Sequence, residues 1–269
     1  MKILIVIQAR TASSRFPNKV LLPLAGAPLL QRMIERVQAA EGPYEIVVAT
    51  TTDPHDDPIR SLCRKIGIRC FSGHPTDLLD RHLEAAQREE ADTVVKIPSD
   101  CPLIDPIVID TVIKFFLSQT KPFDYVSNLH PATYPDGNDV EVMTITALET
   151  AWREAAKDYE REHTTPFLWE QPDRFILGSV LCESGIDYSM KHRWTIDYPE
   201  DYALIKRVYD ELWSAEEPAF TMYDILQLIA KKPEIRTINA RYIGVNWYRH
   251  YVGQLKTVST AETRQAVNS

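Results

Sequence analysis

The chain has 269 residues, of which 44% are hydrophobic and 25% charged, and its formal net charge is −8 at pH 7. This composition is typical of a globular protein with a large core, and the acidic balance argues against general nucleic-acid binding, which needs a basic face. No apolar stretch approaches ~18 residues, so we expect no membrane span.

The N-terminus and the cysteines indicate a cytoplasmic protein. The first ten residues, MKILIVIQAR, are too short and too soon charged for a signal peptide. The four cysteines form no C-x-x-C pair, and no H-E-x-x-H motif occurs. We therefore expect reduced thiols and no zinc site.

The first half of the chain alternates between short apolar runs and amphipathic helical patterns. Continuous apolar strands separated by such helices indicate a parallel sheet covered on both faces, which right-handed crossovers make a doubly wound α/β sheet. The predicted strands are 2–8, 45–51, 68–73 and 92–98, and the predicted helices lie near 28–40, 57–66, 76–90 and 106–117.

The second half is less regular. The predicted strands are 123–128, 138–145, 174–181 and 192–197, and the predicted helices are 147–156, 164–170, 199–213 and 222–231. Without a flexible linker or a repeat, we predict one domain over 1–252, whose second half elaborates the site, and a loose polar tail over 253–269. The aromatic stretch YIGVNWYRHY (242–251) is either core or a contact in a homodimer.

The loop after the first strand is rich in cations. The stretch QARTASSRFPNKVLLPLAG (8–26) carries Arg10, Arg15 and Lys19, and the first acid of the chain is Glu35. Ligands of open α/β sheets sit beyond the carboxyl ends of the strands, where this loop begins. Arginine gives bidentate contacts to phosphate and lysine a point charge, so the loop can cradle a polyphosphate. The alternative is a solvated basic loop.

Two acids follow predicted strands. Asp100 stands in KIPSDCPLIDP after 92–98, and Asp197 ends HRWTIDYPEDY after 192–197. Mg²⁺ binds through one or two carboxylates plus phosphate oxygens, so the two acids can share one ion. The alternatives are a turn-forming role for Asp100 and a helix cap for Asp197, and a cap is the expected role of Asp105.

Weaker candidates lie in three further stretches. Helix capping is the plain interpretation of Thr76 and Asp77 in GHPTDLLDR, and Arg81, one turn on, faces either a nucleotide or water. The other candidates are Asp139 and Glu141 on one face of a strand, as sugar or amine ligands or a solvated edge, and Glu162 with His163 at a helix start.

Together these stretches resemble the cytidylyltransferases that activate acidic sugars as CMP derivatives, and in particular their spore-coat polysaccharide type. The matching stretches keep the family's order over roughly residues 3–205 and include QARTASSRFPNKVLLPLAG, VVATTTDPHDDPI, FSGHPTDLLDRHLEAA, SDCPLIDP, DGNDVEV, REHTTP and RWTIDYPEDY. The resemblance implies a nucleotide-diphospho-sugar transferase fold, similar to the glycosyltransferase A type.

The resemblance also implies roles for the candidate residues. Arg10, Arg15 and Lys19 would bind the CTP phosphates, and Asp100 and Asp197 would hold Mg²⁺. Thr76, Asp77 and Arg81 would lie near the nucleoside, and the acceptor, an acidic sugar or a phosphonate, would face Asp139, Glu141, Glu162 and His163. Two departures are Asn18 and Ser99, which stand where the family commonly has glycine.

The predicted reaction is nucleotidyl transfer, in which an acceptor oxygen attacks the α-phosphorus of CTP and pyrophosphate leaves. One alternative is a glycosyltransferase on the same fold, but no D-x-D follows a strand. Another is a non-catalytic nucleotide-binding protein.

Overall fold

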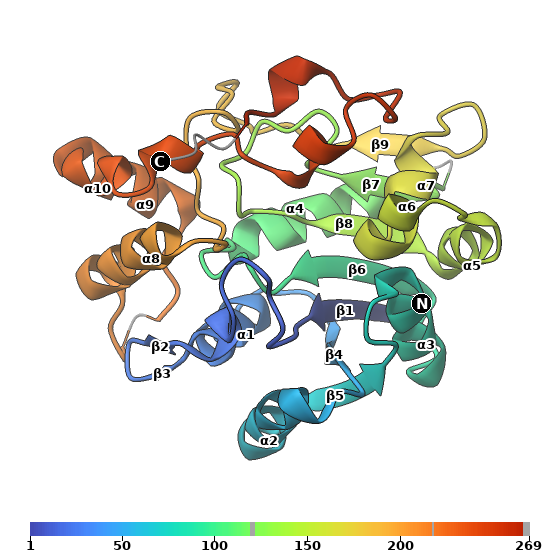
Figure 1. Cartoon of the computed structure of the whole chain (residues 1–269), viewed down its shortest axis with the longest axis horizontal. Helices are drawn as coiled ribbons and strands as arrows, with labels where there is room; N and C mark the ends of the chain where they lie inside the picture. Colours follow the sequence, from blue (N-terminus) through green and yellow to red (C-terminus); the bar gives the residue numbers. More distant parts are fainter. Residues whose placement is uncertain (119–121, 217, 266–269) are drawn as a thin grey trace.

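The computed structural model describes residues 1–118, 122–216 and 218–265, and its centre is a seven-stranded sheet (Figure 1). The strands of this sheet are β1 (Ile3–Gln8), β4 (Glu45–Thr51), β5 (Arg69–Gly73), β6 (Thr93–Pro98), β7 (Tyr125–Ser127), β8 (Glu141–Thr144) and β9 (Leu177–Ser179). Their order is β5-β4-β1-β6-β8-β7-β9. β8 pairs antiparallel with both its neighbours, and all other pairs in the sheet are parallel. This confirms the predicted mostly parallel α/β sheet.

Helices cover both faces of the sheet. One face carries α1 (Leu29–Gln38), α2 (Asp57–Ile66), α4 (Pro106–Leu117), α8 (Pro199–Leu212) and α9 (Met222–Lys231), and the other carries α3 (Leu78–Arg88), α5 (Ile145–Glu154), α6 (Asp158–His163) and α7 (Pro166–Trp169). A small hairpin of β2 (Pro23–Leu24) and β3 (Ala27–Pro28) precedes α1, and the short α10 (Glu234–Thr237) follows α9. None of the helices in these described ranges is long and apolar enough to cross a bilayer.

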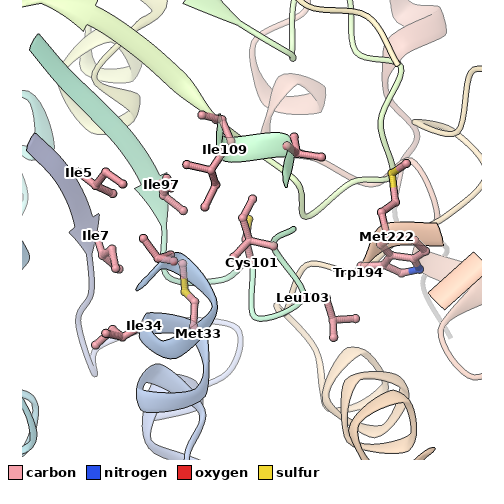
Figure 2. Packing of buried hydrophobic residues seen from close by; sticks show 14 of the residues in the cluster. Ile5, Ile7, Met33, Ile34, Ile97, Cys101, Leu103, Ile109, Trp194 and Met222 are labelled. Carbon is pink, nitrogen blue, oxygen red and sulfur yellow. The ribbon is translucent and has the colours of Figure 1, made fainter. Parts of the chain in front are cut away.

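Two cores result from the alternation of side chains along the strands. Successive strand residues point to opposite faces, so Ile5 and Ile7 of β1 enter one apolar cluster while Leu4 and Val6 enter the other. Figure 2 shows the first cluster, where the β1 isoleucines face Met33 of α1. Both faces of β1 are therefore buried, as its continuous apolar sequence predicts.

The predicted strand over 192–197 is wrong. Only an isolated bridge joins Arg193 to Asp136, and the backbone groups of this segment bond to loops instead of a strand. The Trp194 N–H donates to the Asp136 carbonyl at 2.7 Å. Gly137, at φ 108°, allows this close approach, because a Cβ there would lie 2.7 Å from the backbone of Trp194.

Helix starts near His163 also differ from the prediction. The helix expected over 164–170 begins only at Pro166, which occupies its first turn as predicted, and α6 precedes it. The Glu160 carboxylate accepts hydrogen bonds from the Ala156 and Lys157 N–H groups, both at 3.1 Å, and so caps the start of α6. His163 therefore ends a helix instead of starting one.

The described part of the C-terminal segment, residues 253–265, contacts the second apolar cluster. Leu255 and Val258 are buried in the second apolar cluster. The Glu170 carboxylate accepts hydrogen bonds from the N–H groups of Lys256 at 2.6 Å and of Thr257 at 2.9 Å. The polar sequence of the segment does not predict these contacts, because they depend on a few buried residues and on the Glu170 carboxylate, which is distant in the chain. The single-domain boundary at 252 and the loose tail over 253–269 stay predictions.

Because this protein buries histidine side chains, we expect it to lose stability in mild acid. Burial lowers the pKa of His82, in α3, to about 3, and its Nδ1–H donates to the Leu78 carbonyl at 2.7 Å. Below about pH 6.5 the histidine binds a proton in the unfolded chain but not in the folded chain. The free energy of unfolding should therefore fall by about 1.4 kcal/mol for each unit by which the pH decreases. Urea unfolding of His82→Gln should show a shallower pH dependence between pH 7.5 and 5.5. The exposed His55→Gln variant should keep the pH dependence of the wild type. Equal slopes for the wild type, His82→Gln and His55→Gln would contradict the expectation.

Candidate active site

A cavity of about 580 Å³ opens at the carboxyl ends of β1 and β6. Its lining comes from segments far apart in the sequence: 8–19, 78–81, 96–100, 128–141, 162–169, 187–197, 244–248 and 261–262. The position agrees with the rule that ligands of α/β sheets bind beyond the strand ends.

The loop after β1 is held in shape by its own backbone and by Asp56. The Asp56 carboxylate accepts hydrogen bonds from the N–H and the hydroxyl of Thr11, both at 2.7 Å. The Asn18 N–H donates to the Thr11 carbonyl at 2.9 Å. Asn18 has φ 58°, a left-handed conformation that asparagine tolerates better than most residues, which explains how it stands in a position that favours glycine.

Lys19 brings Asp100 and Asp197 together. Its Nζ lies 3.0 Å from an Asp197 oxygen and 3.6 Å from an Asp100 oxygen, and it also donates to the Ile196 carbonyl at 2.5 Å. The Asp100 carbonyl in turn accepts a hydrogen bond from the Ile196 N–H at 2.9 Å. The structure therefore places both predicted acids beside the cationic loop, although 97 positions separate them in the numbering.

Of the two acids, Asp197 forms more ion pairs with cationic side chains. Arg15 donates to one of its oxygens at 2.6 Å, and Arg193 donates to the other at 3.1 Å. Burial opposes ionisation, but the charges of Lys19 and of these two arginines outweigh it and hold the pKa of Asp197 below its usual range. Asp197 is thus an anion at all physiological pH values.

Asp197 does not cap α8, because Asp201 does so. One Asp201 oxygen accepts hydrogen bonds from the N–H groups of Asp197 at 2.9 Å and of Tyr198 at 3.0 Å. The Asp197 side chain is therefore left to face the cavity. Asp105, by contrast, caps α4 as predicted, accepting from the Ile107 N–H at 2.8 Å.

Arg193, which sequence reasoning missed, organises this side of the cavity. Its buried guanidinium lies within 3.3 Å of carboxylate oxygens of three aspartates, Asp136, Asp197 and Asp201. The signal that points to it is a charged residue inside HRWTID, a stretch that is predicted as a strand.

Arg10 and Arg81 lie close together on the cavity wall. Burial lowers the pKa of Arg81 to about 10, and the charge of Arg10 adds to this effect. Arg81 donates to the His74 carbonyl from Nε at 3.0 Å and so shapes the loop before α3. Among the pairs formed within residues 1–118, 122–216 and 218–265, none joins a carboxylate to Arg10.

Thr76 and Asp77 lie outside the cavity lining. Asp77 caps α3 by accepting from the Asp80 N–H at 2.9 Å, and it pairs with Arg161 of α6 at 2.5 Å. Thr76 is exposed, and its N–H donates to His74 Nδ1 at 3.3 Å. The contacts of Asp77 match the capping alternative, and Asp77 fixes α3 against α6.

The four acceptor candidates all line the cavity. Glu141 is the first residue of β8, and Asp139 lies in the loop before it, so the two do not share a strand. Burial raises the pKa of Asp139 to about 7, and the charge of Asp100 contributes. Glu162 is exposed, whereas burial lowers the pKa of His163 to about 3, which keeps its ring neutral at pH 7.

Aromatic side chains from the C-terminal segment complete the wall beside His163. Trp247 stacks on the His163 ring with centroids 3.8 Å apart, and His130 stacks on Trp169 at 4.2 Å. Tyr242 and Val245 are buried, so the stretch over 242–251 contributes to the core and the cavity of its own chain. Figure 1 shows this red segment beside the β7 and β9 side of the sheet.

The donor set fits a divalent cation of the magnesium type. Asp100 and Asp197 offer hard oxygen ligands, and Asp100 has a side chain that is 32% exposed. Nowhere in residues 1–118, 122–216 and 218–265 do three or more His, Cys, Asp or Glu side chains gather as a metal cluster. Such an ion would therefore take its remaining ligands from phosphate oxygens and water, as Mg²⁺ commonly does.

Known proteins resemble this chain in sequence and in fold. A family model described as cytidylyltransferase matches residues 4–225. The spore coat polysaccharide biosynthesis protein SpsF of Bacillus subtilis is 28% identical over 87% of this chain and 97% of its own. The 8-amino-3,8-dideoxy-manno-octulosonate cytidylyltransferase of Shewanella frigidimarina is 36% identical over 43% of this chain and 48% of its own.

Solved structures of nucleotide-using enzymes have the same fold as this chain. A cytidylyltransferase from Leptospira borgpetersenii superposes with a TM-score of 0.83 at 33% identity, covering 88% of this chain and 97% of its own. A CMP:2-keto-3-deoxy-manno-octonic acid synthetase complexed with CTP superposes with a TM-score of 0.61 at 18% identity, covering 79% of this chain and 100% of its own. At this identity the likeness is one of fold. The architecture is the nucleotide-diphospho-sugar transferase fold. With its sheet, its cationic loop and a match over residues 4–225, the chain belongs to the cytidylyltransferase family.

Proposed function

We propose that this protein transfers a cytidylyl group from CTP to an oxygen of an acidic sugar, or of a related phosphonate or phosphate, and releases pyrophosphate. The observation that carries the proposal is the meeting of Lys19 with Asp100 and Asp197 in one cavity. The relatives named for spore-coat polysaccharide biosynthesis and for cytidylyl transfer to an octulosonate support a role in making surface glycans.

The chain's main work is positioning and neutralising charge, as in phosphoryl transfer generally. The acceptor oxygen forms a bond to the α-phosphorus, and the bond from that phosphorus to the pyrophosphate oxygen breaks. An acceptor hydroxyl gives its proton to water in this step. Arg15 and Lys19 stabilise the departing pyrophosphate, whose negative charge grows as this bond breaks. Mg²⁺, held by Asp100 and Asp197, would supply Lewis-acid polarisation of the phosphate oxygens.

The remaining residues divide between the two substrates. Arg10 and Arg81 sit where they can contact the nucleotide, with Asp77 and Thr76 shaping the start of α3. Asp139, Glu141, Glu162 and His163 line the acceptor part. A neutral His163 can accept a hydrogen bond from an acceptor hydroxyl.

Pyrophosphate release tests the proposal. We expect release from CTP with a panel of acidic sugars and phosphonates, supported by Mg²⁺ and abolished by EDTA. Asp100→Asn and Asp197→Asn should each lower the rate by ~10²-fold or more, because each removes a preorganised charge. The exposed Asp173→Asn is the matched control.

Other outcomes identify the alternatives. Release of a nucleoside diphosphate from a sugar nucleotide would show a glycosyltransferase. Tight CTP binding without turnover, unaffected by either asparagine variant, would show a non-catalytic nucleotide-binding protein.

A further inference from the structure

Lys96 is a charged residue in an otherwise apolar strand. It lies in β6 within the run TVVKIP, and its side chain, 10% exposed, lines the cavity. In the register between β6 and β8 it stands opposite Glu141, and the two form an ion pair. A buried pair of this kind stabilises a fold no better than an apolar pair of similar shape, so stability alone does not account for it.

Glu141 is fully occupied by protein groups. One of its oxygens pairs with Lys96, and the other accepts hydrogen bonds from the Tyr125 hydroxyl at 2.7 Å and the Thr165 hydroxyl at 2.5 Å. Burial opposes its ionisation, but the charge of Lys96 and these bonds outweigh burial and lower the pKa of Glu141. Glu141 is therefore a fixed anion that anchors the ammonium group.

The ammonium group of Lys96 has donors to spare. It carries three N–H donors, and its hydrogen bonds within residues 1–118, 122–216 and 218–265 go to Glu141 alone. The other cation on this side, Arg193, is engaged by three aspartates. A ligand anion in this part of the cavity thus finds free donors on Lys96.

The uncharged rings of two histidines lie near Lys96, together with the carboxyl of Asp139, whose pKa burial raises. Burial lowers the pKa values of His130 to about 4 and of His163 to about 3, and the charge of Lys96 contributes to both. Both rings are neutral at pH 7 and can hydrogen bond without competing for the negative charge.

We propose that Lys96 binds the negatively charged group of the acceptor, a carboxylate in the case of an acidic sugar, and so selects anionic over neutral acceptors. The inference rests on the proposed function and adds to it a residue that determines acceptor specificity. Glu141 acts as a positioning residue, because it holds the ammonium group toward the cavity without needing to touch the acceptor.

The test removes both charges of the pair together, so that neither is left buried alone. The double variant Lys96→Met/Glu141→Gln keeps side-chain size, and urea unfolding checks that it folds. Pyrophosphate release is measured with N-acetylneuraminate and 3-deoxy-manno-octulosonate, each as the acid and as its primary amide. The control is the pair Lys232→Met/Glu211→Gln at the surface.

We expect the double variant to raise KM for the acids by about 10- to 100-fold, the worth of a charged hydrogen bond, while KM for CTP stays unchanged. Its preference for the acid over the amide should disappear. Wild-type KM values and preference in the folded double variant would overturn the proposal and leave the pair a structural feature.

A binding measurement separates this proposal from the proposed function. Titration of the same acids and amides into protein loaded with a non-hydrolysable CTP analogue should show acid-selective binding in the wild type and none in the double variant. Binding without any pyrophosphate release would contradict the proposed function yet support Lys96 as the anion site. The Lys96 proposal would be overturned if the wild type bound acid and amide equally well, or if it bound neither of them.

Discussion

Replacement of Lys19 by methionine should lower the rate of pyrophosphate release by about 10²–10³-fold. Lys19 is held in place before substrate binds, because its ammonium bonds to the Ile196 carbonyl and to Asp197. A preorganised cation of this kind stabilises the charge that develops on the leaving group without reorganising at the moment of reaction. Steady-state assays over CTP and acceptor concentration should show the loss in kcat.

Folding should survive the change. Asp197 keeps its ion pairs with Arg15 and Arg193, so no carboxylate is left buried alone. The exposed Lys65→Met serves as a control for loss of a lysine on the surface. A Lys19→Met protein that unfolds at the wild-type urea concentration and yet retains wild-type kcat would contradict the assignment.

Replacement of Arg193 by methionine should lower the free energy of unfolding by about 3–5 kcal/mol. The side chain is 1% exposed and compensates aspartates from the loop before β8 and from the start of α8. Its loss leaves the fully buried Asp201 carboxylate without a cation, which is among the most costly single changes in a protein interior. Urea unfolding at pH 7.5 measures the effect.

A second variant identifies the cause. Arg193→Met combined with Asp201→Asn removes one of the uncompensated charges and should recover part of the lost stability. Arg207→Met removes an exposed i,i+4 pair with Glu211 and should cost less than about 1 kcal/mol. If Arg193→Met were as mild as Arg207→Met, the electrostatic account of this cluster would be wrong.

Local sequence was sufficient for the elements that form the sheet. β1, β4, β5 and β6 appear where apolar runs predict strands, and α1 to α4 appear where amphipathic patterns predict helices. These elements bury whole faces, so their periodicity is strong and tertiary contacts reinforce it. The cationic loop and Asp100 were likewise found, because they follow strands whose ends the sequence marks clearly.

Only the tertiary structure decided which distant groups meet. The extended segment over 192–197 resembles a strand locally, but its backbone bonds are taken by loops at residues 100 and 136. Lys96 and Arg193 carry no local signal beyond a charge inside a predicted strand, since their partners lie 45 residues away for Lys96 and up to 57 for Arg193.

The sequence by itself determined the α/β framework and pointed to the cationic loop and the two acids, because each depends on residues near one another in the chain. The three-dimensional fold decided that those acids converge on Lys19, that Asp201 rather than Asp197 caps α8, and that the segment after 242 closes the cavity. The physical reason is that ion pairs and aromatic stacking act through space and leave no periodic trace in the sequence.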